Sequence, residues 1–212
     1  MIFSRENIRD EWFSSYSKQW LTELEGVRPS SYLEFANQDL ADGRSPRHLI
    51  NAVSNAKRAL HLEVETLCNK FGRNALNKKR FDNFPNLLRF IEKCGIVDGR
   101  IFNKINGLRN LVEHQYVIPS DEEAENFIDV VDLFLRSTKM LRSSIPYDIV
   151  LIGAIDDSKK FSADFLVADF QKGQISIKIS SLEDVRQRFT KEIDVNEEEY
   201  FIWTAAILRN NY

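Results

Sequence analysis

The hydrophobic pattern of the chain changes its period near Pro146, and this change constrains the fold more than any other feature. Upstream, apolar residues recur every three or four positions, which is typical of helices with one buried face. Downstream, Ile175, Ile177 and Ile179 alternate with polar residues, which is typical of a half-buried strand. The sequence predicts an α+β protein: mainly an α-helical bundle, with a small C-terminal antiparallel β-meander and two terminal helices.

Capping residues and helix breakers give the expected elements. Ser45 followed by Pro46 is typical of a helix start, Gly72 ends that helix, and Ser120 with Glu123 predicts a capping box. We expect helices at about 6–25, 32–40, 46–71, 84–94, 100–116, 121–142, 182–189 and 197–208, and strands at 147–155, 161–170 and 174–179. The expected units are an N-terminal helical extension (1–30), a helical bundle (31–145) and a C-terminal β-meander with helices (146–212).

Composition excludes several classes of protein. Hydrophobic residues make up 43% and charged residues 29%, a balance typical of globular domains. No apolar run approaches the ~20 residues that cross a bilayer, and the charged N-terminus lacks a signal-peptide core, so we expect a cytoplasmic protein with no membrane partner. Cys68 and Cys94 lack metal-ligand spacing, so we expect buried thiols, no metal and no cofactor. The three tryptophans, Trp12, Trp20 and Trp203, are expected in cores.

Charge is unevenly distributed, although the net charge is only −3. From Lys70 to Arg109 there are ten basic and three acidic residues, a difference of +7, whereas Asn110 to Leu135 holds seven acids and no base. The basic stretch is either a set of solvated helix faces or a surface that receives a phosphate backbone.

The stretch LRNLVEHQY (108–116) combines packing residues with polar ones. At ~100° per residue, Leu108 and Val112 share an inward stripe, and Asn110 and His114 lie nearly opposite it. That polar face is either a solvated helix face or a surface for a close partner. Arginine can bind phosphate oxygens, and histidine can transfer a proton near neutral pH. These groups are sufficient for metal-independent RNA cleavage by a 2′-hydroxyl.

Arg109-Asn110-Leu111-Val112-Glu113-His114, with Tyr116 two residues later, resembles the RNxxxH motif of the HEPN domain superfamily. The resemblance covers roughly residues 32–142. It implies a homodimer whose two motifs form one composite ribonuclease site without metal. It also implies that Arg109 stabilises the charged transition state, His114 transfers a proton and Asn110 positions substrate or histidine.

The resemblance leaves several alternatives open. In HEPN toxins paired with an antitoxin the residue matching Tyr116 is modified with AMP, but a structural phenol fits here equally well. Glu113 adds negative charge beside the site. Inactive family members bind nucleotides or partners or serve as dimerisation modules, and the complete Arg-Asn-His set favours an RNase. Secondary candidates for RNA contact are Lys78, Lys79, Arg80 and Lys104. The expected partners are RNA, a second copy of the chain and an antitoxin or regulatory protein, in toxin–antitoxin, stress or antiviral defence.

Overall fold

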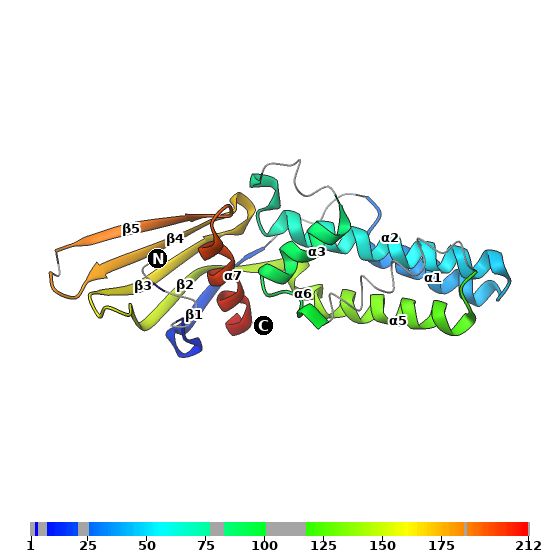
Figure 1. Cartoon of the computed structure of the whole chain (residues 1–212), viewed down its shortest axis with the longest axis horizontal. Helices are drawn as coiled ribbons and strands as arrows, with labels where there is room; N and C mark the ends of the chain where they lie inside the picture. The colour runs from blue at the N-terminus through cyan, green and yellow to red at the C-terminus, as the bar shows by residue number, and fades with distance from the viewer. Residues whose placement is uncertain are drawn as a thin grey trace.

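The computed structural model describes residues 3, 8–20, 26–76, 83–100, 118–184 and 186–211. A helical bundle lies at one end of the elongated molecule and a β-sheet at the other (Figure 1). The helices are α1 (Pro29–Asp42), α2 (Pro46–Lys70), α3 (Phe84–Lys93), α5 (Asp121–Ser137), α6 (Lys139–Ser143) and α7 (Glu198–Asn211), with short 3-10 turns η1 (Asp10–Trp12), η2 (Arg73–Ala75) and η4 (Phe170–Lys172). The strands are β1 (Phe13–Trp20), β2 (Ser144–Ile155), β3 (Phe161–Asp169), β4 (Gln174–Ser181) and β5 (Arg188–Asp194).

Most of the expected bundle helices are confirmed. Helix α2 begins at Pro46 after the Ser45 cap and spans 25 residues. It packs against α1, α3 and α5 through an apolar stripe that is buried along its length. Ser120 and Glu123 form the expected capping box of α5. The expected single helix over 121–142 is divided at Thr138 into α5 and α6.

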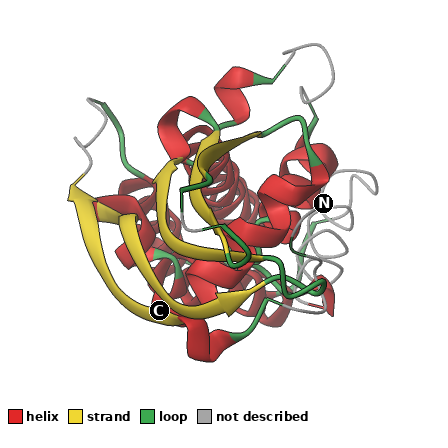
Figure 2. Cartoon of the chain, turned by 90° about the vertical axis from the view of Figure 1, so that its left-hand side faces the viewer, coloured by secondary structure: helices red, strands yellow, loops and turns green. Residues whose placement is uncertain are grey.

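The expected fold class is wrong in its balance of sheet and helix. In place of a small three-stranded meander and two terminal helices there is a five-stranded antiparallel sheet, in the order β1-β2-β3-β4-β5, and one terminal helix, α7. Figure 2 shows that the sheet is curled rather than flat. The protein is therefore an α+β structure in which the sheet forms a full layer with its own buried face.

The first additional strand, β1, lies where a helix over 6–25 was expected. Trp12, Tyr16 and Trp20 recur every four residues, and four is also a multiple of the two-residue period of a strand. The serines between them have low helix propensity, and aromatic residues favour strands. The segment forms a strand and not a helix because it pairs with β2, from Phe13 opposite Leu151 to Trp20 opposite Ser144. The expected N-terminal helical extension therefore contains a strand of the C-terminal sheet.

The second additional strand, β5, replaces the helix expected over 182–189. Ser181 and Asp184 form a turn there: the Ser181 hydroxyl accepts hydrogen bonds from the N–H groups of Glu183 and Asp184. The chain then pairs with β4 from Arg188 onward. The alternation of Phe189 and Ile193 with polar residues indicates this strand in the sequence.

Helix α7 joins the sheet to the bundle (Figure 1). The buried Tyr200 hydroxyl donates to the Phe71 carbonyl, at 3.0 Å, beyond the end of α2. Phe201 meets Phe90 of α3 edge to face, with ring centroids 5.5 Å apart. Trp203 is fully buried. Since β1 and β2 are neighbours, the helices between them form an insertion into the sheet. None of the helices in the described ranges is long and apolar enough to cross a membrane.

Candidate functional site

The candidate catalytic residues Arg109, Asn110 and His114, together with Tyr116, lie outside the described residues. The candidate RNA contacts lie outside them too: these are Lys78, Lys79, Arg80 and Lys104. What the structure describes is the chain on either side of the motif, and the part of the basic stretch that precedes it.

The residues before the motif begin a helix where the sequence predicts one. Gly99 and Arg100 are helical, and the Asp98 carboxylate accepts hydrogen bonds from the Arg100 backbone N–H at 2.8 Å and from its Nε at 3.2 Å. The backbone hydrogen bond, followed by the side-chain one, lowers the pKa of Asp98 below its ordinary value. Asp98 therefore acts as a capping carboxylate for the helix that begins at Gly99 and Arg100.

The residues after the motif are fixed by the first turn of α5. The Ser120 hydroxyl accepts from the Glu123 N–H at 3.2 Å, and the Glu123 carboxylate accepts from the Ser120 N–H at 2.8 Å. These bonds lower the pKa of Glu123. Glu125 forms an ion pair with Arg44, 2.8 Å away, in the connection between α1 and α2. The first turn of α5 is therefore held at the N-terminal end of α2.

The described part of the basic stretch is largely engaged within the protein. Lys70 donates to the Arg142 carbonyl. Arg73 lies 3.4 Å from Glu65, and Lys93 lies 2.8 Å from Glu198. Arg100 pairs with Asp98. Four of the five basic residues described between Lys70 and Arg100 are thus engaged within the chain, which leaves less free charge there for a phosphate backbone.

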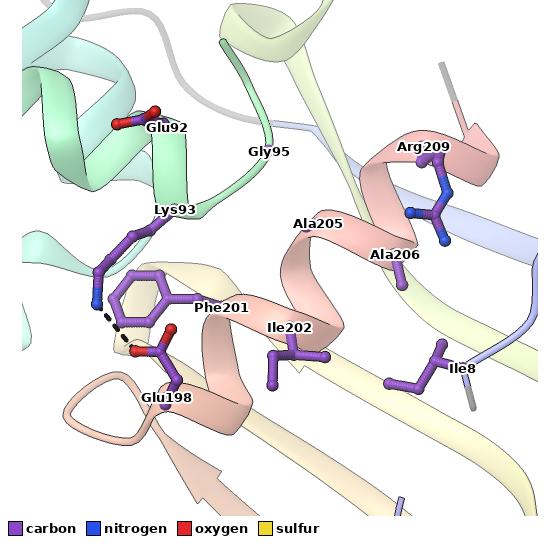
Figure 3. Close-up of a pocket in the computed structure, with 10 residues that line it drawn as sticks. All are labelled: Ile8, Glu92, Lys93, Gly95, Glu198, Phe201, Ile202, Ala205, Ala206 and Arg209. Carbon is purple, nitrogen blue, oxygen red and sulfur yellow. Dashed lines mark hydrogen bonds and ion pairs between the residues drawn. The ribbon is translucent and has the colours of Figure 1, made fainter. Parts of the chain in front are cut away.

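A cleft of about 290 Å³ lies beside the chain that enters the motif (Figure 3). Its floor is formed by Ala205 and Ala206 of α7, and Gly95 forms its upper wall. Gly95 has φ +76°, and a Cβ built there would lie 2.8 Å from the Cβ of Ala205. The absence of a side chain at Gly95 therefore lets the end of α3 approach α7 closely.

Three of the four charged residues that line the cleft are paired with neighbouring side chains: Lys93, Glu198 and Arg209. Lys93 reaches Glu198 across the cleft (Figure 3) and lies over the Phe201 ring, 5.0 Å from its centroid. Arg209, at the other end, donates to Asp10 at 2.5 Å and 2.8 Å. These pairings position α3, α7 and the N-terminal segment against one another. The cleft therefore lies where α3, α7 and the N-terminal segment meet.

Other candidate residues have structural partners. His48 completes the capping box of α2, with Nδ1 at 3.0 Å from the Ser45 hydroxyl. His61 stacks on Phe84, with centroids 5.4 Å apart. Among the residues that the structure describes, no group of three or more His, Cys, Asp or Glu side chains could hold a metal ion.

The cysteine and tryptophan expectations can also be compared with the structure. Cys68 and Cys94 are buried free thiols, as expected. Burial raises the pKa of Cys68 to about 12 and that of Cys94 well above its ordinary value. Trp12 and Trp203 are buried. Trp20 is 75% exposed at the end of β1, so its expected core position is wrong.

Sequence reasoning missed the burial of three charged residues, Glu63, Asp156 and Glu199, of which Glu63 is the most deeply buried. Its side chain is fully buried on α2, accepts a hydrogen bond from the Thr138 hydroxyl at 2.5 Å and pairs with Arg142 at 2.8 Å. The sequence feature that could have indicated its burial is its position beside Val64, on the apolar stripe of α2. Glu63 joins α2 to the α5–α6 break just before the chain enters β2.

Comparison with known proteins gives no relative from which a family could be assigned: the chain matches no family model, no curated protein and no solved structure.

Proposed function

We propose that this protein is a metal-independent endoribonuclease of the HEPN type, acting as a homodimer in a toxin–antitoxin, stress or antiviral defence setting. The observation that carries the proposal is the sequence Arg109-Asn110-Leu111-Val112-Glu113-His114, followed by Tyr116. Two features of the described chain support it: Asp98 caps a helix that begins at Gly99 and Arg100, before the motif, and α5 begins at Asp121, after it.

In the proposed reaction the 2′-hydroxyl of a ribose attacks the adjacent phosphate. The bond from phosphorus to the 5′-oxygen of the next nucleotide breaks, so that the products are a 2′,3′-cyclic phosphate and a 5′-hydroxyl. Arg109 offers a permanently charged fork of donors to the phosphate oxygens as negative charge builds up on them. His114 moves a proton to or from the reacting oxygens. Asn110 holds either the substrate or the imidazole. Lys78, Lys79, Arg80 and Lys104 supply further contacts to the RNA backbone.

The test is cleavage of single-stranded RNA in the presence of EDTA. Wild-type protein is expected to give 2′,3′-cyclic phosphate ends, and His114→Ala and Arg109→Ala are each expected to lower the rate by at least about 100-fold. His48→Ala is the matched control, because His48 only caps α2 and its loss should leave cleavage unchanged. Cleavage by wild-type protein no faster than by His114→Ala would contradict the proposal.

A second candidate is a catalytically inactive HEPN-like module that dimerises or binds a nucleotide or partner. Two observations favour it: Glu113 places a carboxylate within the motif, and the described basic residues Arg73, Lys93 and Arg100 are already paired with acids. Glu113→Gln distinguishes the two candidates. In an active enzyme it should raise RNA affinity or rate, whereas in an inactive module it leaves the protein without cleavage activity.

A further inference from the structure

Strand β5 offers a regular edge for pairing with another strand. Among the described residues it is the last strand of the sheet and pairs with β4 alone (Figure 1). Its register with β4 is continuous from Asp194 opposite Gln174 to Arg188 opposite Ser180. Strand β1, the other edge, pairs with β2 through two irregularities. Irregular edges hinder pairing, whereas a straight edge is a template for another strand.

Backbone hydrogen bonds at both ends of β5 show which residues face the free edge. Ser181 N–H donates to the Gln187 carbonyl, and Val195 N–H donates to the Gly173 carbonyl. Odd-numbered residues therefore bond towards β4. In an antiparallel ladder the alternate residues direct their N–H and C=O groups the other way. These are Arg188, Thr190 and Glu192, so each of them presents one donor and one acceptor to a further strand.

Side chains on the two faces of β5 restrict how a second copy can pair with it. Lys191 and Ile193 point towards α7: Lys191 Nζ lies 2.7 Å and 2.6 Å from the carboxylate oxygens of Glu199, and Ile193 is fully buried. Two β5 strands related by a two-fold axis perpendicular to the sheet keep equivalent faces on the same side. Residues opposite each other in an antiparallel pair have side chains on the same face of the sheet. The axis must therefore lie level with one residue, which then faces its own copy, and not level with the bond between two residues.

Charge selects one register among those that remain. Three symmetric registers pair five or more residues of each strand, given the bounds Arg188–Asp194, and their axes pass through Thr190, Lys191 or Glu192. The second places two lysines opposite each other, each already held by Glu199 of its own chain, and places Arg188 opposite Asp194, whose carboxylate already accepts hydrogen bonds from Asn196. The third places two glutamates opposite each other, which is unfavourable. Only the register centred on Thr190 places each Arg188 opposite a Glu192, with threonine opposite threonine between the two charge pairs.

We propose that two copies of this protein associate through β5, antiparallel about a two-fold axis at Thr190, and so join their sheets into one continuous sheet. Three residue pairs would each exchange two backbone hydrogen bonds. Two symmetry-related Arg188–Glu192 pairs would set the register. The inference is independent of the proposed ribonuclease function, because it rests on residues of the sheet.

Cysteine cross-linking tests the register directly. In the proposed dimer, opposite Cα atoms at position 190 lie about 5.5 Å apart, within the range that a disulfide spans. Position 192 is the matched control, because each residue 192 faces residue 188 of the other copy. The two residues 192 are therefore offset by four residues along the strands, a distance of about 13 Å. Thr190→Cys should therefore form a disulfide-linked dimer under mild oxidation, and Glu192→Cys should not. Wild-type protein, oxidised in the same way, measures the background of cross-linking through Cys68 and Cys94. Cross-linking at 192 but not at 190, or at neither position, would overturn the proposal.

A charge swap tests the same contact without oxidation. Glu192→Arg places arginine opposite arginine twice and should weaken dimerisation through β5 by about tenfold or more. Arg188→Glu should do the same, and the double variant should restore association. The dissociation constant is measured by analytical ultracentrifugation in a His114→Ala background, and Thr190→Cys cross-linking of each variant identifies the β5 contact if another dimer interface persists. Equal cross-linking in all variants, or a double variant as weak as the single ones, would refute the charge pairing. A chain that stays monomeric at every concentration would refute self-pairing and leave this edge for a strand of a different protein.

Discussion

Replacing Glu63 by alanine should destabilise the protein more than any exposed charge on the same helix. The carboxylate is fully buried and has two partners, Arg142 at 2.8 Å and the Thr138 hydroxyl at 2.5 Å. Removing one member of a buried ion pair costs about 3–5 kcal/mol, because the other charge loses its partner. Both partners can recover part of this loss: the Arg142 side chain is 26% exposed and can bind water, and Thr138 still reaches the Phe134 carbonyl at 3.0 Å.

We therefore expect a loss of about 3 kcal/mol for Glu63→Ala. For a chain of 212 residues this corresponds to a fall in Tm of roughly 6–12 °C. The control is Glu65→Ala on the same helix, because Glu65 is 42% exposed and lies 3.4 Å from Arg73. Its loss should cost at most about 1 kcal/mol.

Thermal and urea unfolding followed by circular dichroism measures both variants. The double variant Glu63→Ala/Arg142→Ala should cost less than the sum of the two single variants, since it leaves no unpaired charge. If Glu63→Ala and Glu65→Ala unfold at the same temperature, the buried Glu63 carboxylate does not stabilise the packing of α2 against α5 and α6.

Three further predictions concern stability and reactivity. Gly95→Ala should cost about 1–3 kcal/mol, because φ is +76° and the new Cβ meets Ala205; a Tm equal to that of wild type would contradict the close approach of α3 and α7. Burial raises the pKa of Asp156, but hydrogen bonds from Ser158, Phe161 and Lys160 outweigh it and lower the pKa overall. This stabilisation is complete above the unfolded pKa of about 3.9 and is lost as pH falls through the folded value, so Asp156→Asn should be less stable than wild type at pH 7 and the difference should shrink below about pH 4. A difference that is constant with pH would contradict the role of the carboxylate. Cys68 and Cys94 should react with a thiol reagent only after unfolding, because both are buried with raised pKa values; rapid labelling of native protein would refute their burial.

The elements that could be predicted from the sequence are those in which local signals agree. Ser45-Pro46 and Ser120 with Glu123 are strong helix starts, and α2 and α5 begin there. Strands β3 and β4 also lie where strands were expected, and alternation of apolar and polar residues indicated β4. At the candidate site, the sequence predicted the helix start near Arg100 and the cap that follows Pro119.

The elements that could not be predicted depend on distant pairing. Strand β1 has a pattern compatible with either a helix or a strand, and only β2, far away in the sequence, decides it. Strand β5 was not predicted because the residues before it favour a helix. In the structure the Ser181 turn occupies that position instead. The partner of Glu63 likewise lies on another element, so no local pattern in α2 could identify the Arg142 contact.

The insertion of the helices between β1 and β2 has a consequence for synthesis of the protein on the ribosome. Trp20 pairs with Ser144, so β1 leaves the ribosome 144 − 20 = 124 residues before its partner. At about 5–20 residues per second, β1 waits roughly 6–25 s. The contacts between α1 and α2 are local and can form during that interval, whereas the sheet cannot be completed until β2 is made. An aromatic, serine-rich strand is thus left unpaired during this time, when it can bind a chaperone or the same strand of a neighbouring nascent chain.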